Sequence, residues 1–169
     1  MAKIVELTPS SKPMCQEVYP DDEIELLNPF DYIGKPLPYK DGELGGLFAY
    51  FILNRIPYVY TQTAMKDWAR CLEAGALLHV LVPSLEWICR AFLQEKVEPH
   101  VKPLLFGTQV DEKNIGLNAL KMIELRDLFE IAGCEVRKAK VSKVSIEVGE
   151  EVFKAEQHYV AGVKNESSV

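Results

Sequence analysis

The chain has 169 residues, of which 48% are hydrophobic and 26% charged, a composition typical of one soluble α/β domain. With 19 Lys and Arg against 25 Asp and Glu, its formal net charge is −6, which argues against nucleic acid as a partner. The longest apolar run, residues 47–53, is too short for a membrane span and the amino terminus lacks a signal-peptide apolar region, so we expect a single cytoplasmic domain over residues 1–169.

The first third of the chain predicts short strands separated by a long turn region. KIVEL, residues 3–7, is a strand that ends at a Thr-Pro-Ser turn signal, and EIELL, residues 23–27, is a second strand. Residues 28–46 are rich in turn-forming residues, among them Asn-Pro, Asp-Gly and Gly-Gly pairs. The run LFAYFIL, residues 47–53, is typical of a central strand buried on both faces. A parallel sheet is therefore expected.

The middle of the chain predicts a strand–helix–strand unit. Residues 61–72 place their apolar side chains, including Trp68, on one helical face, and Gly75 stands where it would end that helix. Residues 77–82 form the next buried strand. We expect residues 47–53 and 77–82 to be adjacent parallel strands, with the intervening helix packed on them through Trp68.

The last part of the chain predicts two helices, a long insertion and a hairpin. Ser84 caps an amphipathic helix that continues to Leu93, and residues 97–118, with little periodicity, predict a lid or binding loop. A third amphipathic helix covers residues 122–132. The final strands, 135–148 and 153–164, are joined through Gly-Glu-Glu and predict an antiparallel hairpin.

The cysteines and histidines give no sign of a metal site. All stand singly, without a Cys-x-x-Cys pair or a histidine at ligand spacing. We expect the cysteines to be buried free thiols. His79 lies within an apolar strand pattern and is expected to be a core or edge residue rather than a catalytic base.

Six segments in this order resemble the class I S-adenosylmethionine-dependent methyltransferases. The third of them, RCLEAGALLHVLVPS, matches the family's Arg-x-Leu-Lys-Pro-Gly-Gly turn and Val-Pro-Asp strand end, with Ala76 for the second glycine and Ser84 for the aspartate. The full set is LPYKDGEL (37–44), LNRIP (53–57), RCLEAGALLHVLVPS (70–84), LLFGTQ (104–109), LRDLFEIAGCEV (125–136) and YVAGVK (159–164).

This resemblance implies a Rossmann-like α/β fold, with a mostly parallel sheet in the order 3-2-1-4-5-7-6, helices on both faces and a C-terminal antiparallel hairpin. It also implies S-adenosylmethionine as cofactor. The chain lacks the glycine-rich loop that follows the family's first strand, and KIVEL is better matched to the second strand. The chain would then lack the usual first strand and helix. Either KIVEL moves into the central position, or a second chain covers the gap, most simply in a homodimer.

The resemblance also suggests where a cofactor would be held. By position, Glu6 would bind the ribose hydroxyls, Asp31 the adenine amine, and Tyr50 and Asn54, at the end of strand four, the methionine side and the acceptor. The alternative for Glu6 and Asp31 is that they are solvated turn carboxylates. No catalytic residue or metal ligand is assigned, because methyl transfer needs alignment more than acid–base groups.

The triplet Asn28-Pro29-Phe30 resembles part of the Asn-Pro-Pro-aromatic motif of adenine methyltransferases, but it lacks one proline and precedes the wrong strand. A simple turn is the preferred interpretation. Two functions remain open. One is a methyltransferase acting on a small molecule or sugar, degenerate in its cofactor site. The other is a non-catalytic binding or assembly module that keeps the fold.

Overall fold

The computed structural model describes residues 2–8, 12–94, 98–107, 109, 115–148 and 151–166. These residues form one six-stranded sheet with the strand order β2-β1-β3-β4-β6-β5. The strands are β1 (Ile4–Leu7), β2 (Ile24–Leu27), β3 (Leu44–Tyr50), β4 (Leu72–Pro83), β5 (Cys134–Val148) and β6 (Glu151–Lys164). β1 to β4 are mutually parallel, whereas β6 runs antiparallel to both β4 and β5. The predicted C-terminal hairpin is confirmed, although its turn lies outside the described residues.

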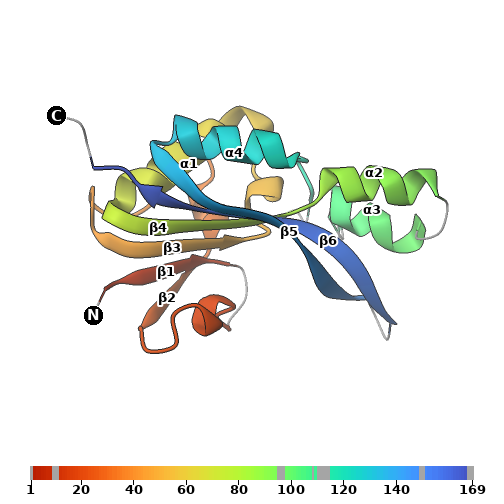
Figure 1. The fold of residues 1–169 in the computed structure, drawn as a ribbon, viewed down its shortest axis with the longest axis horizontal. Coiled ribbons are helices and arrows are strands. Elements are labelled where there is room, and N and C mark those ends of the chain that lie inside the picture. The colour runs from red at the N-terminus through yellow and green to blue at the C-terminus, as the bar shows by residue number, and fades with distance from the viewer. Residues whose placement is uncertain are drawn as a thin grey trace.

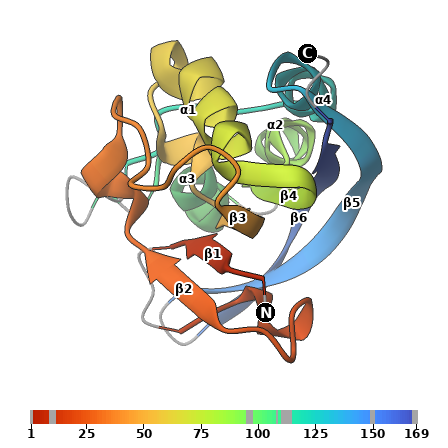
Figure 2. The same ribbon diagram turned by 90° about the vertical axis from the view of Figure 1, so that its left-hand side faces the viewer.

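Helices gather on one face of this sheet. α1 and α4 lie side by side over that face, while α2 and α3 lie beyond the carboxyl ends of the strands (Figures 1 and 2). In the described residues, the opposite face carries only a 3₁₀ turn near its β2 edge, where helices had also been expected. The helices are α1 (Tyr58–Cys71), α2 (Leu85–Leu93), α3 (Glu98–Phe106) and α4 (Met122–Ile131), and the 3₁₀ turns are Cys15–Glu17, Pro29–Tyr32 and Leu53–Arg55.

The predicted central strand pair is confirmed. β3 pairs with β4 in parallel, with Leu47 opposite Leu78 and Ala49 opposite Val80. These side chains are fully buried in the core beneath α1 and α4. β3 ends at Tyr50, earlier than the apolar run suggested, because the chain then turns into a 3₁₀ turn.

β1 occupies the central position that the sequence left in question. It pairs in parallel with β2 on one side and with β3 on the other, with Val5 opposite both Glu25 and Leu47. A strand at the family's second position would not contact the strand equivalent to β3. KIVEL therefore lies at the centre of the sheet, in the place of the family's first strand, which is the first of the two alternatives. Its match to the family's second strand is wrong, the expected loss of the first strand is not confirmed, and no second chain is needed to fill a gap there.

Arg70 connects α1 to the turn region that precedes β3. Its guanidinium donates hydrogen bonds to the carbonyl oxygens of Leu37 and Tyr39, and it forms ion pairs with Asp41 at 2.6 Å and Asp67 at 2.8 Å. Leu37 and Tyr39 in turn bury their side chains in the main core. The Leu-Pro-Tyr segment and the Arg-Cys-Leu segment, distant in sequence, are thus one structural unit.

Two details of the loops differ from expectation. α1 ends at Cys71 and Leu72 already belongs to β4, so Gly75 does not end the helix. Gly75 instead adopts a positive φ of 84° in the irregular start of β4, a conformation that favours glycine, while Ala76 packs into the core. The predicted insertion at residues 97–118 contains α3, which packs against α2 through Val101.

The core predicts a large cost for shortening Trp68. This side chain is 3% exposed and packs within the main core under α1. Trp68→Ala should lower the free energy of unfolding by about 3–5 kcal/mol, because it leaves a cavity that the sheet cannot fill. Urea denaturation measures this change. The control is Lys66→Ala, on the exposed side of the same helix, which should change the free energy of unfolding by less than about 0.5 kcal/mol. Equal effects of the two substitutions would contradict the packing of α1.

Candidate functional site at the carboxyl ends of β1 and β3

The sheet has one topological switch point, between β1 and β3. From β1 the chain passes outward to β2, and from β3 it passes outward in the other direction to β4. In open α/β sheets, ligands bind in the crevice outside the carboxyl ends of the strands at such a point. Here that edge is formed by Thr8 after β1 and by Phe51 and the 3₁₀ turn Leu53–Arg55 after β3.

Glu6 lies beside this edge, but its carboxylate is directed into the protein. The residue is fully buried, and its Oε2 accepts hydrogen bonds from the backbone N–H groups of Met14 at 2.7 Å and Cys15 at 2.8 Å. Its Oε1 is also buried and has no hydrogen-bond partner in the described residues. Glu6 is therefore not a solvated turn carboxylate, and one of its oxygens is committed to the start of the 3₁₀ turn Cys15–Glu17.

The Cys15 thiol belongs to the same cluster. Burial, together with a hydrogen bond to Glu6, raises its pKa to about 12. The thiol is therefore protonated at neutral pH and inert as a nucleophile. Cys71 and Cys134 are also buried free thiols as expected, whereas Cys89 is exposed.

These residues do not fit S-adenosylmethionine in the way the family resemblance implies. The family's loop needs glycines and a helix N-terminus whose N–H groups face the ligand. This chain has no glycine before Gly34, and Pro9 and Pro13 lack an N–H group. A 3₁₀ turn stands in place of the helix, and the N–H groups of Met14 and Cys15 face Glu6 instead.

The segment after β2 is a capped turn. The Asn28 side chain accepts a hydrogen bond from the Phe30 N–H at 3.1 Å and thereby starts the 3₁₀ turn Pro29–Tyr32. The turn interpretation of Asn28-Pro29-Phe30 agrees with this geometry, because the amide oxygen is occupied by the backbone. Asp31 lies in the same turn and is exposed.

The turn after β3 carries backbone strain and an unpaired polar atom. Phe51 has a positive φ of 53°, which is rare for an aromatic residue, and its ring stacks on Tyr50 with centroids 4.4 Å apart. Asn54 is 9% exposed, and its Oδ1 has no hydrogen-bond partner in the described residues, while its carbonyl oxygen accepts from the N–H groups of Leu117 and Asn118. Such strain clusters at functional sites.

The four predicted site residues are thus only partly brought together. Glu6 and Tyr50 project from the same face of neighbouring strands, because Glu6 pairs with Phe48. Asn54 lies on the turn beyond β3, and Asp31 is on a separate exposed turn. None of them lines the cavity of about 390 Å³ between α1 and α4, or three other hollows on the surface of the described residues.

His79 is a satisfied core histidine, as the sequence indicated. It is 3% exposed, with Nε2 2.9 Å from the Tyr19 hydroxyl and Nδ1 2.8 Å from the Tyr159 hydroxyl. Burial lowers its pKa to about 4, so the ring is neutral at physiological pH. This network fastens the segment containing Tyr19 to the face of the sheet opposite α1 and α4.

Sequence reasoning missed a second buried histidine. His158 on β6 is 2% exposed, and its Nε2 lies 2.7 Å from Oε2 of Glu86 in the first turn of α2. The other oxygen of Glu86 accepts from the N–H of Met122 at the start of α4. Glu86 therefore joins α2, α4 and β6. No sequence signal identified this pair, because its two members are separated by 72 positions.

No protein-family model matches the chain, and no curated protein matches it in sequence. Solved structures do match its fold. A protein from Bacillus halodurans, provisionally assigned to the methyltransferases, superposes with a TM-score of 0.62 at 8% identity, over 98% of this chain and 92% of that one.

Two further structures agree with this match. A SAM-dependent methyltransferase from Methanosarcina mazei gives a TM-score of 0.61 at 13% identity, covering 96% of this chain and 81% of that one. A Thermotoga maritima SAM-dependent methyltransferase, described as a possible histamine N-methyltransferase, gives 0.55 at 19% identity, covering 98% and 83%. At these identities the likeness concerns the fold, which is the Rossmann-like fold of the class I methyltransferases.

The described residues contain no cluster of three or more His, Cys, Asp or Glu side chains placed to hold a metal ion. Nor does any helix in the part of the chain that the structure describes combine the length and apolarity needed to cross a membrane.

The geometry of Glu6 predicts a structural role. Glu6→Ala leaves the N–H groups of Met14 and the buried Cys15 without their acceptor and should lower the free energy of unfolding by about 3 kcal/mol. Glu6→Gln keeps an acceptor and should cost only about 1 kcal/mol. Guanidinium denaturation gives both values, with the exposed Glu17→Ala as a control. A Glu6→Ala protein as stable as the wild type would show that the carboxylate is dispensable for folding.

The buried neutral His79 predicts a pH dependence of stability. Its pKa is lowered from 6.5 to about 4 in the folded protein, so the unfolded state binds the proton more tightly. The contribution of His79 is therefore complete above pH 6.5 and is lost as the pH falls toward 4. Between pH 7 and about pH 4.5 the loss should be roughly 2–3 kcal/mol, and it should be absent in His79→Phe. Parallel stability profiles of the two proteins would contradict this assignment.

Proposed function

We propose that this chain, which has the class I methyltransferase fold, is a degenerate member of that fold class with weak or no binding of S-adenosylmethionine. The observation that carries the proposal is the orientation of Glu6. Its carboxylate holds the N–H groups of Met14 and Cys15, which removes from the switch point the kind of backbone donors that a charged ligand needs there.

A second observation supports the same conclusion. Where the family has a glycine-rich loop, this chain has Thr8, Pro9, Ser10 and, further on, Pro13. Side chains with a Cβ keep a ligand farther from the backbone than glycine does, and each proline removes one donor. Any methyl transfer to a small molecule or sugar would therefore start from a poorly held cofactor.

The alternative is a non-catalytic binding or assembly module. One specific observation favours it, because a cavity of about 390 Å³ lies between α1 and α4, away from the switch point. Tyr58 and Val59 at its margin are 74% and 76% exposed. Exposed apolar side chains beside a cavity are typical of a surface that binds a ligand or partner.

We also propose that the chain forms a homo-oligomer. Light scattering tests this directly, because it measures the mass of the particle in solution.

Calorimetric titration with S-adenosylmethionine and S-adenosylhomocysteine tests the degenerate site. Losing two hydrogen bonds to charged ligand groups, each worth about 1.5–3 kcal/mol, weakens binding roughly a hundredfold to ten-thousandfold. From an intact site with a dissociation constant of about 1 µM, we expect about 0.1 mM or weaker for this chain.

Dissociation constants in the low micromolar range would overturn the proposal. In that case two variants locate the ligand. Glu6→Gln removes the carboxylate on β1, and Asn54→Ala removes the side-chain amide on the turn after β3. A loss of affinity confined to Asn54→Ala would place the ligand after β3 alone, whereas a loss with Glu6→Gln would mean that this carboxylate serves the ligand as well as the fold.

A further inference from the structure

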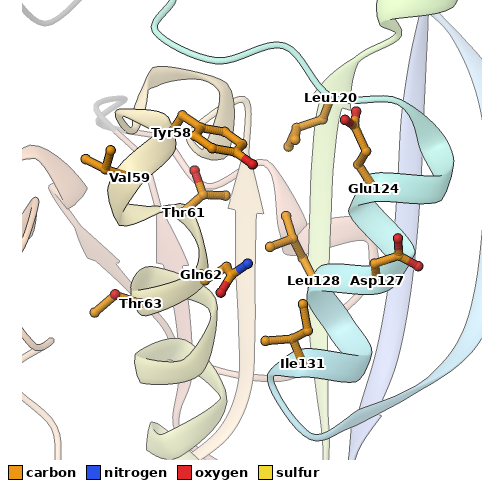
Figure 3. A pocket seen from close by; sticks show the side chains of 10 residues that line it. All are labelled: Tyr58, Val59, Thr61, Gln62, Thr63, Leu120, Glu124, Asp127, Leu128 and Ile131. Carbon is orange, nitrogen blue, oxygen red and sulfur yellow. The ribbon is translucent and has the colours of Figure 1, made fainter.

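The cavity between α1 and α4 has the dimensions of a small-ligand site. Its volume is about 390 Å³, within the range of pockets that hold small molecules. Figure 3 shows Tyr58 and Gln62 pointing from α1 toward α4, and Leu128 and Ile131 pointing from α4 toward α1. The space thus lies between side chains of two neighbouring helices and is open to solvent on one side.

The floor of this cavity is apolar and buried. Leu120 and Leu128 are 3% and 7% exposed and belong to the main core. Thr61, which also lines the cavity, has its hydroxyl occupied, because it donates to the carbonyl of Pro57 and accepts from Asn118. These residues offer a ligand an apolar surface and no further hydrogen bonds.

The mouth of the cavity is polar, and its charged side chains are all acidic. Glu124 and Asp127 on α4 contribute carboxylates, and none of the ten lining residues is Lys, Arg or His. One oxygen of Glu124 accepts the Lys121 N–H at 2.8 Å and caps α4. Asp127, Gln62 and the Tyr58 hydroxyl have no hydrogen-bond partner within the described residues. A ligand therefore meets an aromatic ring, an amide and two carboxylates above an apolar floor.

We propose that this cavity binds a small organic cation with an apolar body, such as an aryl or alkyl amine. The apolar part would rest on Leu120 and Leu128, and the ammonium group would lie near Glu124, Asp127 and the ring of Tyr58, since cations are attracted both to carboxylates and to the faces of aromatic rings. This inference goes beyond the proposed function and does not depend on it, because none of the residues at the switch point takes part.

Three probes of one shape and different charge test this proposal. Phenethylamine is a cation at neutral pH, 2-phenylethanol is neutral, and 3-phenylpropanoate is an anion. In titrations followed by ¹H–¹⁵N NMR, the cation should shift amides in the first turns of α1 and along α4, and should bind about threefold more tightly than the neutral probe. The anion should not bind there. Equal binding of cation and anion, or shifts confined to other elements, would overturn the proposal.

Two pairs of variants locate the binding. Gln62→Trp fills the cavity and should abolish the shifts, whereas Lys66→Trp adds bulk at an exposed position of the same helix that does not line the cavity and should leave them unchanged. Glu124→Gln with Asp127→Asn keeps an acceptor at the α4 cap. This pair should weaken binding of the cation about threefold, to the level of the neutral probe, and should leave binding of the neutral probe unchanged.

The matched charge control is Glu17→Gln with Asp21→Asn, two exposed residues near β2 whose substitution changes the net charge by the same amount. This pair should bind the cation as the wild type does. Full binding by Gln62→Trp, or the same weakening in both charge pairs, would refute a site between α1 and α4. Circular dichroism of each variant confirms that its fold is retained.

Discussion

The architecture depends on one constraint: β1 must lie between β2 and β3 for the sheet to be continuous, and a strand in that position is buried on both faces. All four residues of β1 are buried, including Glu6, whose carboxylate therefore has to find donors inside the protein. It finds them in the N–H groups of Met14 and Cys15. The segment after β1 is in this way tied to the sheet rather than opened toward a ligand.

The two faces of the sheet are stabilised in different ways. Beneath α1 and α4 lies a continuous apolar core, to which Arg70 fastens the Leu-Pro-Tyr segment through hydrogen bonds and ion pairs. The other face has a small cluster around Phe48 and Leu81, with the neutral His79 held between Tyr19 and Tyr159. On this second face, polar contacts with the segment before β2 thus cover and stabilise the sheet, as the helices do on the first face.

This division separates the two places where a ligand might be expected. At the switch point, the backbone donors face inward to Glu6, and what remains is the strained Phe51 and the buried Asn54. The cavity between α1 and α4 is lined by residues of these two helices and by Leu120 just before α4. Because the two places share no residue, the proposed loss of cofactor binding at the first would leave the proposed binding at the second intact.

The sequence alone determined the elements whose signals are local. The apolar runs around Leu47 and Leu78, the helical periodicity around Trp68 and the Asn-Pro turn at Asn28 specified strands, helix and turn, because side-chain periodicity and turn chemistry act over a few neighbouring residues. It also indicated that His79 is a core residue, since an apolar strand pattern surrounds it.

The tertiary structure decided the features that depend on long-range pairing. The central position of β1, the inward orientation of Glu6 and the Glu86–His158 pair each join residues distant in sequence or depend on which strand lies alongside. Gly75 is similar, because the irregular start of β4, not the end of α1, requires its positive φ. The sequence of a four-residue strand does not say which position of a sheet the strand takes. Competition among the strands for pairing partners therefore decides where KIVEL lies. That position in turn decides which backbone N–H groups remain available to a ligand.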